Sequence, residues 1–437
     1  MKNNIAIFLF LLTTCAFSQE ADSTVVFKKR VLEATEVDFL ASYYKQDGVH
    51  SSVSGGIGSE KLTDIASNIV VAMPLNDDDV LTIDVGISAY TSASSSNINP
   101  YDSSNPSPWQ SSSGASEQDA LVSLVANYNH SSNNRNLVYN VDVSFSNEYD
   151  YTSVGFGGGI AKLFNNKNSE ISLKVNAYID QWRPIYPFEF RLGNGVLTNP
   201  AYAPSFTEWD STARNSYSAT VGFSQVVNKK TQFSLFFDVV QQQGKLSSPY
   251  HRIYFADKAN FYIGNPTFIS NYENENNQGA YQLADAIEKL PNTRFKLPFG
   301  MRWNYYLNER FVVRTYYRYY TDSWDITAHT ASIEVPIKIS DKFTVIPMFR
   351  YYTQTQSKYF APYETHLSTE KFYTSDFDLS SFSANQYGLG MSYTDVFTKA
   401  HIWKFGLKNI DFRFNHYDRS DGLNANIGTL GFKFIVQ

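Results

Sequence analysis

The sequence is poor in cysteine, since Cys15, close to the amino terminus, is the only one among 437 residues. After Gln19 it also lacks any apolar run approaching the roughly 18 residues that a transmembrane helix requires. Charge is sparse: Asp, Glu, Lys and Arg make up 18% of the residues, and the formal net charge is −6. These absences argue against a helical membrane protein, a disulfide-rich domain and a nucleic-acid partner.

The first 18 residues predict export from the cytoplasm. A basic residue precedes the apolar stretch 5–12, and Ala16-Phe17-Ser18 is a small-x-small cleavage site, so residues 1–18 read as a secretory signal peptide. A lipoprotein signal around Cys15 fits less well, because Thr14 is found where a small residue such as Gly or Ala is needed. If cleavage follows Ser18, the mature chain has no cysteine, which excludes disulfides, a thiol nucleophile and cysteine metal sites.

Aromatic residues, in contrast, are abundant: Phe, Trp and Tyr make up 16% of the chain, although its mean hydropathy is negative, at −0.33. The segment 294–358 contains four long alternating stretches separated by short turns. In the second of these stretches, Phe311, Val313 and Thr315 alternate with Arg314, so one face is apolar and the other ionic. The stretches run to about 13–16 residues, against five or six in an ordinary strand. Strands of this length, when tilted, cross a bilayer.

The pattern therefore predicts an all-β fold, a transmembrane antiparallel up-and-down β-barrel of about 16 strands, formed by residues 19–437 as one domain. Long loops are expected at 91–119, 183–213, 245–292 and 359–382, with short turns between them. Because bacterial barrels place long loops outside and short turns in the periplasm, both termini should be periplasmic. The expected location is the outer membrane of a Gram-negative bacterium. The expected partners are outer-membrane lipid and the barrel assembly machinery, without nucleic acid.

Two local features are ambiguous in the sequence. Asp47-Gly48 is either a hairpin turn or a bulge within one strand, 37–53; an even strand number favours the bulge. In the longest loop, Tyr281, Leu283 and Ile287 have helical spacing and predict a short helix over 278–289.

Several segments resemble one known family. They are Ser92-Ala93-Ser94-Ser95-Ser96-Asn97-Ile98, Ser248-Pro249-Tyr250-His251-Arg252, Arg318-Tyr319-Tyr320-Thr321-Asp322-Ser323-Trp324-Asp325-Ile326 and Arg350-Tyr351-Tyr352-Thr353-Gln354. Together they look like the domain-of-unknown-function 3570 family (DUF3570), a family of predicted outer-membrane barrels without an established biochemical activity. The resemblance also implies that neighbouring genes encode a small lipoprotein, a thioredoxin-like exported redox protein and a flavin transferase. One departure is that the chain ends on Phe434-Ile435-Val436-Gln437 rather than on an aromatic residue, which displaces the assembly signal slightly.

The ionic faces must line the lumen, because charged side chains are costly in lipid. The candidate site residues are the lumenal charges Arg302, Arg314, Arg318, Glu334, Arg350, Asp238 and Asp142. One interpretation is that these charges pair across the lumen and hold the barrel's shape. The other is a water-filled path with a basic wall that favours anions.

A row of small residues on one lumenal face, Gly155, Gly157, Gly159 and Ala161, leaves room for a segment to press against it. The loop segment Asp285–Glu288 is a candidate plug for this space. The seven histidines show no metal-ligand spacing and no nucleophile-elbow pattern occurs, so we expect neither an enzyme nor a cofactor. The sequence thus favours a channel or transport barrel, with a scaffold for a periplasmic lipoprotein or redox partner as the alternative.

Overall fold

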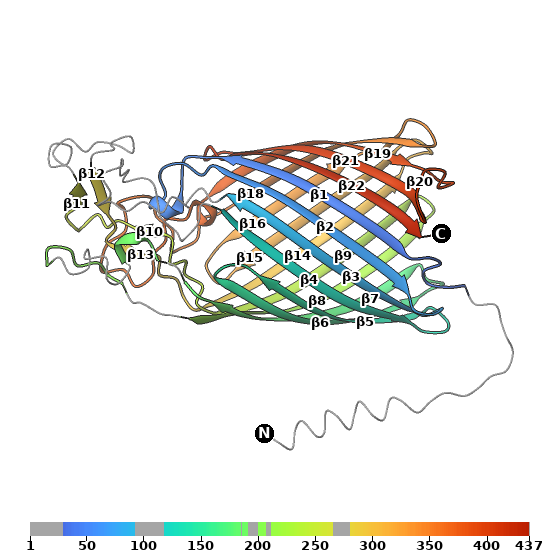
Figure 1. Ribbon diagram of the computed structural model, residues 1–437, viewed down its shortest axis with the longest axis horizontal. Helices are drawn as coiled ribbons and strands as arrows, with labels where there is room; N and C mark the ends of the chain where they lie inside the picture. The colour runs from blue at the N-terminus through green and yellow to red at the C-terminus, as the bar shows by residue number, and fades with distance from the viewer. Residues whose placement is uncertain are drawn as a thin grey trace, which may run out of the picture.

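The computed structural model describes residues 29–91, 118–184, 186–190, 200–206, 211–264 and 280–436. Within them the chain forms a closed antiparallel barrel of sixteen long strands (Figure 1). Each strand pairs with the next along the chain, and β22 pairs with β1 from Glu36↔Ile435 to Asp47↔Asn424, which closes the cylinder. The all-β, up-and-down barrel predicted from the sequence is confirmed. The predicted signal peptide, 1–18, lies outside the described residues.

The strands are close to the lengths expected for tilted crossing of a bilayer. They are β1 (Glu36–Asp47), β2 (Leu62–Pro74), β3 (Asp79–Thr91), β4 (Gln118–Ser131), β5 (Leu137–Asn147), β6 (Tyr151–Phe164), β7 (Ser169–Trp182), β8 (Thr212–Asn228), β9 (Thr231–Gly244), β14 (Thr293–Tyr306), β15 (Val312–Asp322), β16 (Thr327–Glu334), β18 (Phe343–Gln354), β19 (Phe382–Thr394), β21 (Phe405–Arg419) and β22 (Asn424–Val436). Two short pieces, β17 (Ile337–Lys338) and β20 (His401–Ile402), complete the sheet. No helix in the described part of the chain is both long and apolar enough to cross a membrane.

Alternation along each strand separates a lipid face from a lumenal face. On β5, Val141, Val143 and Phe145 are 59%, 52% and 46% exposed on the outside of the barrel. Asp142 and Ser144, between them, lie on the opposite, lumenal face. An outer surface made of such rows is stable only in hydrocarbon, so this is a membrane-spanning barrel.

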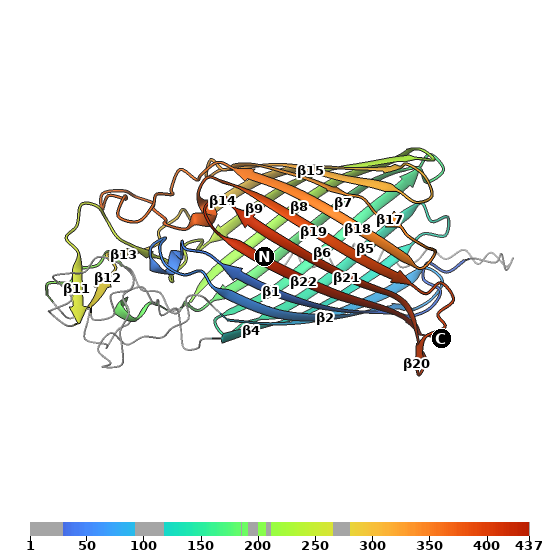
Figure 2. The ribbon, with the colours of Figure 1, turned by 90° about the horizontal axis from the view of Figure 1, so that it is seen from above.

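The two ends of the barrel differ in the length of their connections. Short turns join β2 to β3, β6 to β7 and β8 to β9 at one end, and the long loops leave from the other. Both ends of the described chain lie on the short-turn side (Figures 1 and 2): Val31 N donates to Asp77 O at 3.0 Å, and Val436 N donates to Thr35 O at 2.9 Å. By the asymmetry of bacterial barrels, the short-turn end is periplasmic and the long-loop end extracellular.

The bulge predicted at Asp47-Gly48 is wrong, because β1 ends at Asp47. The chain then turns through η1 (Ser52–Ser54), and Gly55 and Gly56 have φ of 83° and 91°, a region that favours glycine. The apolar alternation that suggested a longer strand continues into a loop, where backbone groups bond within the loop, as Ser51 N does to Gly58 O at 3.3 Å, instead of to a neighbouring strand. The predicted total of sixteen strands is nevertheless correct.

The helix predicted over 278–289 is also wrong in its described part. β12 (Ala280–Leu283) pairs with β11 (Phe261–Gly264), and β13 (Ala286–Ile287) pairs with β10 (Arg252–Ile253). Leu283 and Ile287 are both buried there. The spacing of apolar residues reflected burial of this segment on several sides, not one face of a helix.

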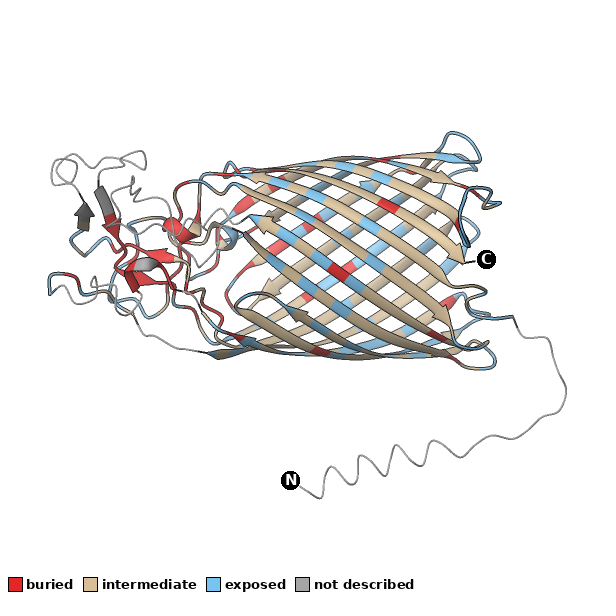
Figure 3. Ribbon diagram, in the orientation of Figure 1, coloured by how far each residue is buried: buried red, intermediate tan, exposed pale blue. Residues whose placement is uncertain are grey.

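The long loops pack together into a body of their own, which we call the loop cap. It comprises the described residues 48–61, 186–190, 200–206, 245–264, 280–292 and 355–381 and includes η2 (Phe188–Phe190) and η3 (Phe377–Leu379). Figure 3 shows buried residues concentrated beyond the end of the barrel, while the barrel walls are mostly intermediate or exposed. Its apolar clusters are Tyr186, Phe190, Tyr254, Ala284 and Ile287; Ile253, Phe255, Ala286 and Tyr373; and Leu246, Leu290 and the rim residue Trp324.

Candidate functional site

The predicted lumenal arginines gather on adjacent strands, which we call the basic wall: Arg302, Arg314, Arg318 and Arg350 with Glu334. In the register of β14 and β15, Arg302 lies opposite Tyr316, so Arg314 and Arg318 are its two diagonal neighbours. The row continues from Tyr316 through β16 to Arg350 on β18. The register therefore brings Arg302 and Arg314 close to each other across adjacent strands.

Glu334, the last residue of β16, is the acid of this wall. It lies directly opposite Arg314 in the register, and its Oε2 is 3.8 Å from Arg314 Nη1. A second arginine, Arg413 on β21, places Nη1 2.8 Å from Glu334 Oε1. Arg413 spans β18 and β19 to do so, and Gly390 on β19 leaves space beneath its side chain, because a Cβ there would lie 3.4 Å from Arg413 Cγ. One carboxylate is thus shared by two guanidinium groups.

The other three arginines of the wall have no carboxylate within 4.0 Å among the described residues. Arg302 lies over the ring of Tyr316 at 5.8 Å, and Arg318 lies over Tyr320 at 6.0 Å. Arg318 Nε is buried and has no hydrogen-bond partner in the part of the chain that the structure describes. Arg350 lies opposite Ser332 on one side and Gln386 on the other, both neutral. This wall therefore carries uncompensated positive charge.

Of the other two predicted acids, Asp142 on β5 lies several strands from the basic wall, whereas Asp238 lies on β9, which pairs directly with β14. By the same alternation, three further lumenal aspartates occur on β2, β3 and β7: Asp64, Asp84 and Asp180. Lys174 Nζ is 4.0 Å from Asp142 Oδ1, too far for a strong ion pair. Aspartates thus predominate on the lumenal face over β2–β9, and arginines predominate over β14–β21.

Charged groups inside the barrel are accessible to water. The side chains of Arg314, Arg413 and Lys174 are 50%, 41% and 52% exposed, although all three belong to the lumenal face. A lumen filled by side chains would bury them. Barrels of sixteen strands are wide enough to hold water, so these fractions describe a wet interior at the level of these residues.

The plug predicted to lie against the glycine row is not found there. A Cβ on Gly157 would lie 2.3 Å from Asp142 Oδ2, and one on Gly159 would lie 2.5 Å from Asn140 Oδ1. The glycines therefore accommodate polar side chains of the neighbouring strand β5. The segment 285–288 is instead buried in the loop cap, where Asp285 N donates to Ile253 O at 3.0 Å.

The cap is held by a buried ion pair between two loops. Arg252 Nε and Nη2 donate to Glu189 Oε1 and Oε2 at 2.6 and 2.9 Å, and Nη1 donates to Val53 O at 2.8 Å. Arg252 is 1% exposed and Glu189 0%. A bidentate guanidinium–carboxylate pair has a fixed geometry, so it fixes three loops relative to one another.

Next to Arg252, His251 meets two carboxylates. Its Nδ1 lies 3.1 Å from Glu288 Oε2 and 4.0 Å from Asp376 Oδ2. Burial alone would lower the pKa of His251, but the charge and hydrogen bond of Glu288, together with the charge of Asp376, raise it to about 9. Burial raises the pKa of Asp376 to about 7, against the opposing charge of His251. Burial likewise disfavours ionised Glu288, but the charge and hydrogen bond of His251, together with the hydrogen bonds from Thr374 and Ser248, outweigh it and lower the pKa of that carboxyl.

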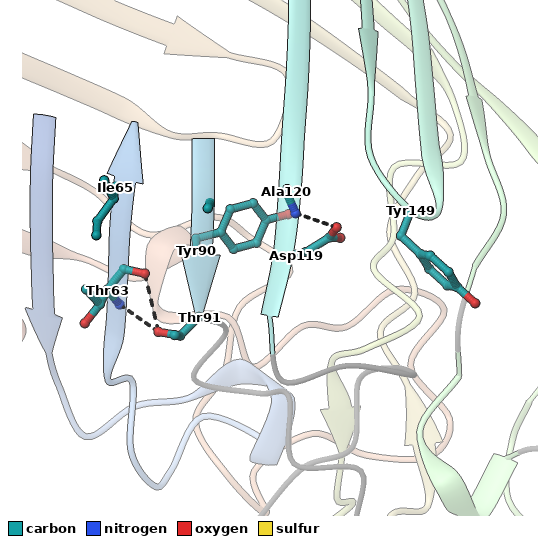
Figure 4. A pocket seen from close by; sticks show the side chains of 8 residues that line it. Thr63, Ile65, Tyr90, Thr91, Asp119, Ala120 and Tyr149 are labelled. Atoms are coloured by element: carbon teal, nitrogen blue, oxygen red, sulfur yellow. Dashed lines mark hydrogen bonds between the residues drawn. The ribbon is translucent and has the colours of Figure 1, made fainter. Parts of the chain in front are cut away.

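A pocket of about 470 Å³ lies at the extracellular rim where β2, β3 and β4 end (Figure 4). It is lined by Thr63, Ile65, Ala89, Tyr90, Thr91, Asp119, Ala120 and Tyr149. Thr63 N donates to Thr91 Oγ1 at 3.0 Å along its edge. Ile65 belongs to the outward apolar row, so the pocket sits in the wall at the rim and contains none of the predicted lumenal residues.

Three carboxylates, Asp119, Glu148 and Asp150, meet near this rim. Trp182 Nε1 donates to Asp150 Oδ2 at 3.0 Å, and Tyr250 of the cap donates its hydroxyl to the same oxygen. Burial raises the pKa of Glu148, and the charges of Asp119 and Asp150 raise it further. The cap is therefore attached to the barrel rim through an acidic cluster.

A closed barrel with an apolar outer face and an ionic lumen defines the class of this protein, an outer-membrane β-barrel. Within that class, residues 9–432 match the family described as "Protein of unknown function (DUF3570)", and the chain belongs to this family. The family resemblance stated from the sequence is confirmed over nearly the whole chain.

Among solved structures the chain is similar in fold to several outer-membrane barrels. A bacterial polysaccharide outer membrane secretin has 9% identity and a TM-score of 0.43, with 92% of this chain and 99% of that chain covered. A FadL homologue of Pseudomonas aeruginosa has 10% identity and a TM-score of 0.40, covering 92% and 90%. The TodX monoaromatic hydrocarbon channel deltaS2 mutant has 9% identity and a TM-score of 0.38, covering 93% and 90%. No curated protein matches the chain in sequence.

Sequence reasoning missed two groups of residues. Arg413 lies on the ionic face of β21, but its pairing with Glu334 across two strands has no local signal in the sequence. The cap contacts of His251 and Arg252 were also missed, although both residues belong to the 248–252 segment that carries the family resemblance. That segment was the available signal, because it combines charged residues with proline and tyrosine in a loop.

Proposed function

We propose that this protein is a channel or transport barrel whose lumen favours anionic solutes. The observation that supports the proposal is the uncompensated positive charge of Arg302, Arg318 and Arg350 on a wet lumenal wall. Guanidinium groups that line a water-filled path attract anions and lower the barrier to their passage. The proposed role is transport rather than catalysis.

The distribution of charge supports a path along one side of the lumen. Aspartates such as Asp84 on β3 and Asp142 on β5 lie several strands away from the wall over β14–β18 and are opposite to it in sign. An anion inside the barrel is repelled by the first side and attracted by the second. Because these groups face a confined lumen, their fields are less screened than on an open surface.

The loop cap at the extracellular end regulates access in this proposal. Its buried pair Arg252–Glu189 and its apolar clusters give it a defined fold beyond the barrel mouth (Figure 3). Solutes must pass around the cap or displace it. Loosening the cap should therefore raise conductance without changing ionic preference.

Planar-bilayer recording of the purified barrel in a salt gradient tests the proposal. Wild-type protein should show a reversal potential on the anion-selective side, and Arg318→Ala and Arg350→Ala should each reduce that preference. Arg310→Ala, in a periplasmic turn outside the lumen, is the matched control and should leave it unchanged. The same recordings on Arg252→Met measure the effect of the cap. Absence of conductance in both wild type and Arg252→Met would refute a transport role.

A second candidate, a scaffold for a periplasmic lipoprotein or redox partner, is favoured by one observation. The periplasmic connection between β19 and β21 exposes Val396, Phe397, Ile402 and Trp403, the last to 93%. Its short β20 hairpin projects at the short-turn end (Figure 2). Loss of a co-purifying lipoprotein on Trp403→Ser, with conductance absent, would support the scaffold in place of the channel.

A further inference from the structure

His251, Glu288 and Asp376 converge in the loop cap, apart from the lumen on which the proposed function rests. One ligand atom from each lies within 4.8 Å of the other two. We propose that these three side chains form a binding site for a divalent transition-metal ion, with Zn²⁺ as the ion that the donor set fits best. The transport proposal does not require this site, and the metal proposal does not depend on transport.

The distances suit zinc. At zinc–ligand lengths of about 2.0–2.2 Å, tetrahedral ligand atoms lie roughly 3.3–3.6 Å apart. His251 Nδ1 is 3.1 Å from Glu288 Oε2 and 4.0 Å from Asp376 Oδ2, which brackets that spacing. One imidazole and two carboxylates are a zinc-type ligand set, and a fourth position remains for water.

The charge of the cluster also favours a cation. Once a metal ion displaces the proton of His251, Glu288 and Asp376 present two negative charges to it, at a place where their side chains are 3% and 23% exposed. Buried charge is stable only when it is paired or bound to a metal. A divalent ion neutralises both carboxylates and uses the imidazole nitrogen as a neutral ligand.

Both carboxylates also accept hydrogen bonds from neighbouring groups, which orient them as the outer-shell partners of metal ligands usually do. Glu288 Oε1 accepts from Ser248 N at 2.6 Å, and Oε2 accepts from Thr374 Oγ1 at 2.5 Å. Asp376 Oδ1 accepts from Asp378 N at 2.9 Å. Its other oxygen, Oδ2, receives no hydrogen bond from the described residues and points at the shared space with His251.

The site would join two loops of the cap. His251 and Glu288 belong to the 245–292 loop, and Asp376 belongs to the 355–381 loop. An ion bound by all three adds a cross-link beside the buried pair of the neighbouring Arg252. Its predicted effect is greater resistance of the cap to local opening, by linkage of binding to folding.

The same cap contains a matched control. His366 Nδ1 lies 2.6 Å from Glu370 Oε2, but its Nε2 lies 3.0 Å from Thr374 O and no second carboxylate joins it among the described residues. This histidine is 4% exposed, so it shares the burial of the proposed site without its donor set. Replacing it should disturb the cap without removing a metal ligand.

The test uses the tag-free, full-length barrel in detergent, stripped with a chelator and titrated with ZnCl₂. Wild type should bind one Zn²⁺ per chain by calorimetry and by elemental analysis after dialysis. Asp376→Asn keeps an amide oxygen for Asp378 N but loses the carboxylate. It should weaken binding by about 100-fold or more, since loss of a second-shell partner alone costs roughly 10–100-fold. His366→Asn should bind as wild type does.

Protease resistance of the cap separates binding from folding. With chelator, wild type and Asp376→Asn should be cut at similar rates; with Zn²⁺, only wild type should become more resistant. Absence of stoichiometric binding in wild type would overturn the proposal. Equal binding by wild type and Asp376→Asn would overturn it as well, as would a loss of binding confined to His366→Asn.

Discussion

Replacing Arg252 by methionine should open the loop cap while leaving the barrel intact. Methionine keeps much of the volume of the side chain but removes three charge-assisted hydrogen bonds, two to Glu189 and one to Val53 O. It also leaves the carboxylate of Glu189, which is 0% exposed, without its cation. Breaking a buried pair by removal of one partner costs about 3–5 kcal/mol, so the population of the open cap should rise roughly 10²- to 10⁴-fold.

Hydrogen exchange of backbone amides and limited proteolysis of the purified barrel would measure this effect. Amides of the cap, such as Lys289 N bonded to Tyr373 O at 3.1 Å, should lose protection, whereas those of β5 and β6 should not. Lys358→Met is the control: its ion pair with Asp325 is 42% and 65% exposed, and such surface pairs contribute less than about 1 kcal/mol. Cap protection within threefold of wild type in Arg252→Met, or an equal loss in Lys358→Met, would refute the reasoning.

Three further predictions concern the barrel and its rim. Ile333→Arg, on the lipid face, should reduce the folded fraction on heat-modifiability gels, because the substitution costs about 2–4 kcal/mol if the site is near the midplane. Lumenal Thr344→Arg should be tolerated, and equal behaviour of the two variants would contradict the assigned faces. Gly157→Ala should destabilise the barrel in urea by about 1–3 kcal/mol, because the new Cβ would lie 2.3 Å from a carboxylate oxygen of Asp142. Gly158→Ala is the control and should not destabilise the barrel, because its Cβ would lie 3.4 Å from the nearest atom. Burial raises the pKa of Glu148, so its contribution to stability is full below the unfolded pKa and is lost as pH rises through the folded value. Glu148→Gln should therefore flatten the pH dependence of urea unfolding above about pH 4, and an unchanged slope would count against the assignment.

The charges of the lumen were predicted by type but not by partner. Alternation along β15 placed Arg314 and Arg318 on the ionic face, and the register then set Arg314 opposite Glu334. The partner at 2.8 Å, Arg413, comes from a strand 79 residues away along the chain. A period of two gives the direction of a side chain, inward or outward, but not its position around the barrel.

The cap escaped prediction for a related reason. Loops carry no periodicity, so the helical spacing around Ile287 indicated a helix where the chain forms short strands buried on several sides. His251 and Glu288 are 37 residues apart and meet only because loops from different parts of the barrel rim fold over one another. No local pattern encodes such a contact.

The sequence by itself determined that the chain is a membrane-spanning barrel of about sixteen strands, with long loops on one end and short turns on the other. That information is local: the hydrocarbon layer demands an apolar residue at every second position, and turn residues mark where strands end. The tertiary structure alone decided where the charge lies around the lumen, and that Asp142 fills the space over Gly157. It also decided that His251, Glu288 and Asp376 face one another. These arrangements depend on closure of the sheet between β1 and β22 and on packing between loops, which bring together residues that are distant in the sequence.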